Sequence, residues 1–450
     1  MPLFYGPAVY LLRKLLRTCI NFYFVFCFIF CLLNIASTQL GHAKAITHPL
    51  NNLTTTALPL PHDFYLIKNK NNNNNLWSVI IQGFEINHES TNPRVKFFIH
   101  YDLTHKNLIM AVLNNSRPVL YLITQAILQR NLPTELALLP AVESGYRLNI
   151  PAYTDSGALG LWQLLPQTAQ DYGGNVDDSY WYDGRMDIQA STWAALSFLA
   201  ALNQDFNHNW LLSIAAYNSG ETTVKNSLVL NTKLGKSKNF FDLQLPEQTQ
   251  DYVPKLLALC IIIQNAKKYG MTLPIIPNQP LIKKILLTRQ INLATAAHLS
   301  DTPLAEINQL NADFLYGIVP YKGPSYLYIP SNKVRYFINA ANTYNYNNYW
   351  HLYAVEPGDF LSIIANQHKT TVSNLIKLNN LNSSVLQPHQ KLIIPSASGR
   401  LREISKIKPN ENLSSFAKHH RLSLSELQFI NGLDPIVQKN GPQPAMLLIN

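Results

Sequence analysis

A threefold repeat in the C-terminal third of the chain most strongly restricts how the chain can fold. Three segments align on an asparagine: Asn311, Asn379 and Asn431. In each segment the residues one, four and seven positions before the asparagine are aliphatic, an alanine lies fourteen positions before it, and a leucine lies eighteen positions before it. Aliphatic residues at this spacing form one face of a helix. Agreement at so many positions in three places indicates a repeated structural unit.

Each repeat predicts two short helices between two strands. The copies close with alternating segments at 327–330, 392–395 and 447–450, and opening strands are expected at 285–287, 353–355 and 404–407. A βααβ unit of this size can bury one small core. We therefore expect three modules, at residues 283–330, 351–395 and 401–450.

The N-terminus has the pattern of an export signal. Arg13, Lys14 and Arg17 precede an uncharged apolar run over residues 18–40, and Ala43-Lys44-Ala45 offers a small-x-small cleavage site. The apolar run is also long enough to cross a membrane, so an uncleaved anchor is the alternative. Residues 1–45 are therefore predicted to be a signal peptide or membrane anchor.

Between this segment and the repeats, the sequence predicts a spacer and then a helical region. Residues 46–75 are rich in Thr, Pro and Asn, which is typical of a disordered linker. Residues 76–274 have mostly helical periodicity and end before the stiff segment 274–280, which contains three prolines. Helices are expected at 118–130, 191–202, 210–217 and 250–267.

Charge and cysteine usage exclude several classes of protein. The net charge is +10, but Lys and Arg are scattered, which argues against a nucleic-acid interface. Three of the four cysteines lie in the N-terminal apolar stretch, and Cys260 is expected to be a buried, inert thiol. None of the thirteen histidines has zinc-site spacing, and no nucleotide-binding loop is present, so we expect no metal and no cofactor.

The segment 135–146 carries the most informative acid. It predicts one short amphipathic helix, capped by Thr134 and stopped by Gly145. Glu143 lies four and seven residues after Leu139 and Leu136, so it falls on the apolar face. Burial raises the pKa of a carboxyl group, and a general acid needs a proton near neutral pH. The alternative is a solvated, inert Glu at a helix end.

Three further motifs follow in order. The segment 155–166 contains Asp155, two glycines, Trp162 and Gln163; Ala-Tyr-Asn-Ser-Gly follows at 216–220; Thr-Gln-Asp-Tyr-Val follows at 249–253. Each one alone is compatible with a packing or capping role. Together with Glu-Ser at 143–144 they resemble the lytic transglycosylase family of the lysozyme superfamily, and the resemblance runs from about residue 76 to residue 270.

The repeats resemble LysM modules, a family that binds glycans containing N-acetylglucosamine. The two resemblances imply an α-rich lysozyme-like (α+β) catalytic domain at 76–274 followed by small βααβ LysM-type modules. They also imply a monomer in the periplasm or cell envelope that acts on peptidoglycan glycan strands, either free or associated with the membrane. Neither family implies nucleic acid as a partner.

The family resemblance assigns roles to matching residues. Glu143 would be the single catalytic acid/base in a reaction that leaves a 1,6-anhydro sugar end. Ser144 would orient Glu143, and Tyr252 would position the acid or the sugar. Contacts to the acetamido and sugar groups would come from Gln163, Tyr217 and Asn218. This chemistry needs no second carboxylate, and Asp155 is the nearest candidate for one.

Some positions depart from the family patterns. Gln248 stands immediately before Thr249, where the family usually has Glu, and Glu247 is one residue earlier. The middle repeat has the Gly-Asp turn at 358–359, which the other two lack, and it has His389 where LysM modules commonly have Gly. The middle repeat is therefore the expected glycan-binding module. The outer two are degenerate and either have a structural role or bind weakly.

Two other functions share these features. A hydrolytic muramidase would use water and release reducing ends in place of anhydro ends. A non-catalytic peptidoglycan-binding protein would rely on the repeats alone. The identity of the reaction products separates all three.

Overall fold

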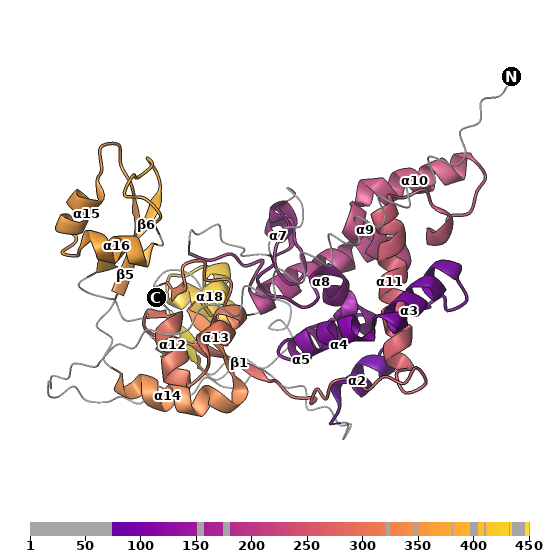
Figure 1. The fold of residues 1–450 in the computed structure, drawn as a ribbon, viewed down its shortest axis with the longest axis horizontal. Helices are drawn as coiled ribbons and strands as arrows, with labels where there is room; N and C mark the ends of the chain where they lie inside the picture. The colour runs from indigo at the N-terminus through magenta and orange to yellow at the C-terminus, as the bar shows by residue number, and fades with distance from the viewer. Residues whose placement is uncertain are drawn as a thin grey trace. The chain divides into compact units, whose positions relative to one another are not determined.

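A computed structural model of the chain describes residues 74–150, 157–173, 181–320, 325–344, 349–379, 381–396, 404–408, 411–431, 433 and 446–449 (Figure 1). The predicted signal or anchor segment and the linker up to residue 73 lie outside the described residues. No helix in the described ranges combines the length and the apolar character needed to cross a membrane.

Residues 76–264 form an assembly of helices, which we call the helical part (Figure 1). The helices predicted at 118–130, 191–202, 210–217 and 250–267 are confirmed. The elements in chain order are α2 (Leu76–Gln82), α3 (Pro93–Thr104), α4 (Lys106–Asn115), α5 (Leu120–Leu128), η1 (Thr134–Leu138), α6 (Leu139–Glu143), α7 (Pro166–Gly173), α8 (Ile188–Asp205), α9 (Trp210–Ser219), α10 (Glu221–Lys233), η2 (Phe240–Asp242) and α11 (Glu247–Gln264).

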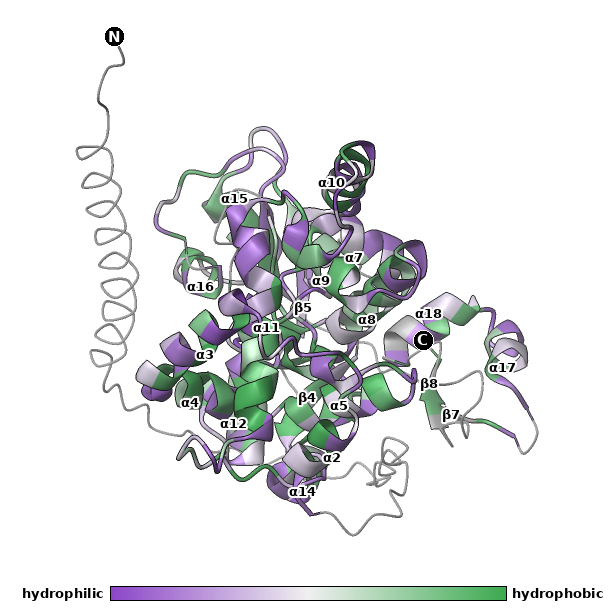
Figure 2. Cartoon of the chain, turned by 90° about the vertical axis from the view of Figure 1, so that its right-hand side faces the viewer, coloured by the Kyte–Doolittle hydropathy of each residue, from purple (hydrophilic) through white to green (hydrophobic). Residues whose placement is uncertain are grey.

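Helix α11 lies in the core of the helical part. Every residue from Leu256 to Ile263 is buried, and a helix that is apolar on all sides belongs in a protein interior. Figure 2 colours each residue by its hydropathy, with hydrophobic residues in green. Cys260 is a free cysteine without exposed surface, and burial raises the pKa of its thiol. The predicted burial of this thiol is therefore confirmed.

The three repeats have the predicted βααβ architecture. Their outer strands pair antiparallel: β1 (Ile282–Leu286) with β4 (Tyr326–Pro330), β5 (Tyr349–Ala354) with β6 (Lys391–Ser396), and β7 (Ile404–Lys406) with β8 (Met446–Leu448). Between them lie α12 (Leu293–Ser300) and α13 (Leu304–Leu310), α15 (Leu361–Gln367) and α16 (Val372–Leu378), and α17 (Leu413–His419) and α18 (Leu424–Asn431). The first repeat also contains elements that were not predicted: β2 (Ile291–Asn292), β3 (Ile318–Val319), η3 (Ser331–Lys333) and α14 (Val334–Thr343).

The asparagine that defines the repeat connects the second helix to the closing strand. In the middle repeat the Asn379 amide nitrogen donates to Leu375 O and Ile393 O, both at 2.9 Å, and its oxygen accepts from Ile393 N at 2.6 Å. Asn311 makes the equivalent three bonds in the first repeat. An amide can donate and accept at once, so no aliphatic side chain could replace it here.

A second recurrent feature was not predicted. Asp301, Lys369 and Arg421, each ten residues before the repeat asparagine, have positive φ angles of 49°, 52° and 58°. They form the turn between the two helices of each repeat, in a conformation that costs an L-residue about 1–2 kcal/mol. His389, at the position where LysM modules commonly have Gly, also has a positive φ of 67°.

The segment 135–146 is not one helix, contrary to our prediction. A 3₁₀ turn, η1, is followed by the separate helix α6. Pro140 has no N–H to donate, so it is tolerated only in the first turn of a helix, and the α-helix begins next to it at Leu139. Thr134 does not cap either helix, because its hydroxyl donates to Ile80 O. Gly145, with φ of 61°, ends the helical stretch as expected.

Candidate active site

Glu143 is the last residue of α6 and is half-buried. Leu136 in η1 and Leu139 at the start of α6 have no exposed surface. The Tyr252 hydroxyl, from α11, donates a hydrogen bond to Glu143 Oε1. Burial raises the pKa of Glu143 to about 7, although this hydrogen bond lowers it in part. The carboxyl group therefore exists in both protonation states near neutral pH, as an acid/base catalyst requires.

A tight turn after Glu143 fixes where the acid lies. Gly145 and Tyr146 have consecutive positive φ angles of 61° and 58°. The buried Tyr146 hydroxyl donates to Ala137 O at 2.7 Å, and the Asn115 amide donates to Gly145 O at 3.0 Å. A left-handed tyrosine costs conformational energy, and these contacts hold it in place.

Ser144 joins this turn to a second one. Its hydroxyl lies 2.8 Å from Leu161 O and 3.2 Å from Pro140 O, so it bonds backbone carbonyl groups. Its hydroxyl therefore contacts main-chain atoms of α6 and of the second turn, and not the Glu143 carboxyl group. The predicted role of Ser144 in orienting the acid stays a prediction.

The second turn, residues 157–164, carries Gln163. Leu159 and Leu164 exchange backbone hydrogen bonds of 3.1 and 3.2 Å, which close the turn. A Cβ atom on Gly160 would lie 2.2 Å from Arg185 O, so only glycine fits there. Gln163 has φ of 48°, and its amide nitrogen donates to Gly160 O at 2.9 Å.

Trp162, in the same turn, packs in the core as predicted. It has no exposed surface, and its indole N–H donates to the Thr192 hydroxyl of α8 at 2.9 Å.

Tyr217 and Asn218 lie at the end of α9. The Tyr217 hydroxyl donates to Trp162 O at 2.8 Å. Burial and the nearby Glu143 charge raise its pKa, so the hydroxyl stays protonated. Asn218 Oδ1 accepts from the Thr249 hydroxyl at 2.9 Å, which directs the amide nitrogen elsewhere. Thr249 is not among the predicted site residues, although its spacing of three from Tyr252 on a helix indicates that the two lie on one face.

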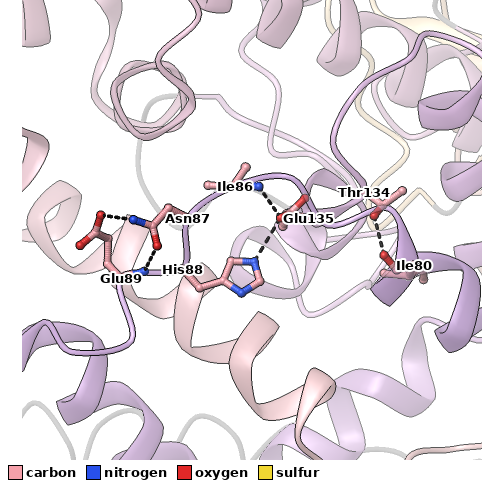
Figure 3. A network of polar contacts seen from close by, with 7 residues as sticks. All are labelled: Ile80, Ile86, Asn87, His88, Glu89, Thr134 and Glu135. Atoms are coloured by element: carbon pink, nitrogen blue, oxygen red, sulfur yellow. Dashed lines mark hydrogen bonds and ion pairs between the residues drawn. The ribbon is translucent and has the colours of Figure 1, made fainter.

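Glu135, in η1, is a second buried acid in this segment and is not among the predicted site residues. It has no exposed surface, and its Oε1 accepts from Ile86 N at 2.7 Å and lies 3.1 Å from His88 Nε2 (Figure 3). Figure 3 shows these contacts connecting η1 to the segment that follows α2. Glu135 therefore joins two parts of the backbone. Asp155, the other acid considered, lies outside the described residues.

The structure thus brings two of the predicted residues, Glu143 and Tyr252, into direct contact, and Ser144 bonds Leu161 O of the turn that carries Gln163. Tyr217 contacts that same turn through Trp162 O. Within the described ranges, no group of three or more His, Cys, Asp or Glu side chains is arranged to hold a metal ion.

Three families match the chain. Residues 121–240 match the transglycosylase SLT domain, residues 282–346 match the LysM-like domain of lytic transglycosylase MltD, and residues 353–395 match the LysM domain. The membrane-bound lytic murein transglycosylase D of Escherichia coli strain K12 is 32% identical over 358 residues, which cover 75% of this chain and 78% of that protein. The chain belongs to the membrane-bound lytic murein transglycosylase D family.

Three other similar proteins match smaller parts of the chain. A putative tributyltin chloride resistance protein of Alteromonas sp. strain M-1 is 38% identical over 37% of this chain and 77% of its own length. The 70 kDa soluble lytic transglycosylase of Escherichia coli aligns with a TM-score of 0.28 and 19% identity, over 43% of this chain and 32% of its own. An inactive mutant of the lytic transglycosylase Slt from Pseudomonas aeruginosa aligns with a TM-score of 0.27 and 22% identity, over 34% of this chain and 25% of its own.

Membership in the transglycosylase D family makes this chain a lytic transglycosylase enzyme with LysM-type peptidoglycan-binding modules. It also confirms the predicted fold class, a lysozyme-like α-rich domain followed by small modules that contain strands.

Proposed function

We propose that this enzyme cleaves the β-1,4 bond between N-acetylmuramic acid and N-acetylglucosamine in peptidoglycan and leaves a 1,6-anhydro-N-acetylmuramic acid end. One observation carries the proposal. Glu143 has a pKa of about 7, raised by burial, and accepts a hydrogen bond from the Tyr252 hydroxyl.

In the first half of the reaction, protonated Glu143 gives its proton to the glycosidic oxygen as the bond to C1 of the muramoyl residue breaks. The acid then becomes a carboxylate in a poorly solvated setting. The Tyr252 hydroxyl already donates to one of its oxygens and stabilises this charge as it forms.

In the second half, the Glu143 carboxylate takes the proton from the muramoyl C6 hydroxyl, and O6 bonds to C1 of the same sugar. Glu143 is thereby returned to its starting protonation state. The nucleophile belongs to the substrate, so neither a water nor a second carboxylate takes part, unlike in glycosidases with paired acids.

We assign the remaining predicted residues to positioning and to sugar contacts. Ser144 holds the backbone beside the acid, and Tyr252 positions the carboxyl group. Gln163, Tyr217 and Asn218 contact the acetamido and sugar groups. The left-handed backbone of Gln163 and the Thr249 bond that directs Asn218 support this assignment.

The predicted domain organisation extends the proposal. Residues 1–45 direct export, residues 46–75 link, residues 76–274 catalyse, and the module at 351–395 holds the enzyme on glycan strands. The modules at 283–330 and 401–450 are degenerate. We place the enzyme in the periplasm or cell envelope as a monomer, and the name of its Escherichia coli relative supports association with the membrane.

Digestion of purified sacculi by the full-length protein tests the reaction. Mass spectrometry should find anhydro-ended muropeptides with wild type and almost none with Glu143→Gln. Reducing ends in place of anhydro ends would indicate a hydrolytic muramidase. Binding to sacculi without any release of fragments would indicate a non-catalytic wall-binding protein.

A further inference from the structure

The first repeat module, residues 282–346, packs against the helical part through one face of β4. Alternate side chains of this strand pack in two different hydrophobic cores. Leu327 and Ile329 join the core of the module, whereas Tyr326 and Tyr328 join the core of the helical part. Successive side chains of a strand point to opposite faces, so β4 is buried on both sides.

The two tyrosines distinguish the first repeat from the others. When the repeats are aligned on Leu327 and Leu392, the positions of Tyr326 and Tyr328 correspond to Lys391 and Ile393 in the middle repeat. The strand that closes the middle repeat therefore has no hydroxyl at either position.

The module meets the helical part at residues 181–187. Leu315 N donates to Trp181 O at 3.0 Å and Asp183 N donates to Asp313 O at 2.9 Å, which forms a short antiparallel bridge. The buried Tyr326 hydroxyl donates to Asp187 Oδ2 at 2.8 Å. A buried hydrogen bond to a carboxylate is among the stronger contacts between neutral and charged groups.

Lys284 of β1 adds a cation to this buried contact. Its ammonium group lies 4.0 Å from the centre of the Tyr326 ring and bonds the Gln189 side chain. It also faces Asp313, whose pKa is raised by burial and by the Asp187 charge. A cation beside the buried Asp313 reduces the cost of burying that acid.

The same segment supports the turn that carries Gln163. Arg185 Nη1 donates to Gly157 O at 2.6 Å, and Arg185 O occupies the space beside Gly160. Asp187 also caps α8, because its Oδ1 accepts from Gln189 N and Ala190 N at 2.8 and 2.6 Å. Helix α8 in turn holds the Trp162 indole of that turn through Thr192.

We propose that Tyr326 is a positioning residue for the active site. Its hydroxyl holds Asp187 and the 181–187 segment, and these fix the 157–164 turn, whose Leu161 O bonds Ser144. The first module therefore completes the active site as part of its scaffold. For its effect on turnover, this proposal depends on the proposed function.

The test compares full-length wild type with Tyr326→Phe, which keeps the ring and removes the bond to Asp187. Hydrogen exchange followed by mass spectrometry should show faster exchange across residues 157–164. On a short soluble glycan, kcat should fall at least about threefold, with about 10²-fold as the ceiling for a displacement of 1 Å. Tyr353→Phe is the matched control, because it removes a Tyr–Asp bond of the same 2.8 Å length in the middle repeat. It should leave exchange in the turn unchanged.

Wild-type exchange across 157–164 together with wild-type kcat in Tyr326→Phe would overturn the proposal. If that variant does not fold, Lys284→Met is tested instead, because it leaves the tyrosine in place and removes the ammonium group beside its ring. Faster hydrogen exchange across residues 157–164 in Lys284→Met would support the proposal, and wild-type exchange there would overturn it. Wild-type product analysis separates the two proposals. Absence of anhydro ends refutes the proposed function, whereas the exchange result judges the role of Tyr326 independently.

Discussion

Removing the Tyr252 hydroxyl should move the pH dependence of catalysis in a known direction. The hydroxyl donates to Glu143 and so stabilises the carboxylate over the protonated acid. A hydrogen bond to a charged group contributes about 1.5–3 kcal/mol, and 1.36 kcal/mol corresponds to one pH unit. Tyr252→Phe should therefore raise the pKa of Glu143 from about 7 by about 1–2 pH units.

The measurement is kcat/KM against pH, because this ratio reports groups of the free enzyme. A general acid must be protonated, so activity falls as pH rises through its pKa. The midpoint of the alkaline limb should lie about 1–2 pH units higher in Tyr252→Phe than in wild type, even if the maximal rate is lower. A soluble glycan oligomer with chromatographic detection of the anhydro product provides the assay.

Tyr217→Phe is the matched control for this experiment. Its hydroxyl donates to Trp162 O and makes no bond to the carboxyl group of Glu143. The rate of this variant can fall, but the midpoint of its alkaline limb should stay where wild type has it. A Tyr252→Phe limb at or below the wild-type midpoint would refute the assignment of Glu143 as the acid that Tyr252 stabilises.

Three further predictions concern activity and stability. Glu143→Gln should lower turnover by about 10²–10⁴-fold. The same variant should have a free energy of unfolding at pH 9 that is up to about 3 kcal/mol higher than that of wild type. The reason is that the pKa of the Glu143 carboxyl group rises from 4.5 to about 7 on folding, so ionising this group destabilises the folded state as pH increases. An equal gain at pH 5 in urea titrations would contradict this reasoning. Gly160→Ala should lower the free energy of unfolding by more than the roughly 1–3 kcal/mol that a positive φ alone costs, because the new Cβ atom also clashes with Arg185 O. Thermal unfolding should show a smaller effect for Gly235→Ala, where φ is also positive but nothing lies within 4 Å. Asn379→Ala should destabilise the middle module by about 2–4 kcal/mol, at roughly 1 kcal/mol for each of its bonds; unchanged exchange of the Ile393 amide would contradict the role assigned to this side chain.

The repeats could be predicted from sequence because their information is local and periodic. Aliphatic spacing predicts the helices and alternation predicts the strands, and the middle and third modules each have a small core of their own. The left-handed turns at Asp301, Lys369 and Arg421 escaped prediction because neither composition nor periodicity marks them. The break between η1 and α6 does not follow from the aliphatic spacing, which continues through the segment. It follows from Pro140, which has no N–H to donate and is tolerated only in the first turn of a helix.

The candidate site was predicted as a set of residue types and only partly as an arrangement. Glu143 is half-buried, as its spacing to two leucines predicts, although the segment is not the single helix on which that prediction rests. Its bond to Tyr252 spans 109 residues, and no local pattern encodes such a distance. Glu135 shows that residue type and segment alone do not identify a site residue. It has the same residue type in the same segment, but burial beside the Ile86 amide makes it structural.

The sequence by itself determined the four predicted helices of the helical part, the two helices and two outer strands of each repeat, and the residue types of the candidate site. Tertiary structure alone decided which tyrosine meets that carboxyl group, which acid is enclosed by backbone, and that the first repeat packs against the helical part through Tyr326. The physical reason is that helix and strand formation depend on neighbours in the chain. Protonation and docking depend on which distant groups share a buried space, because desolvation and hydrogen bonding act only between groups that the fold has brought together.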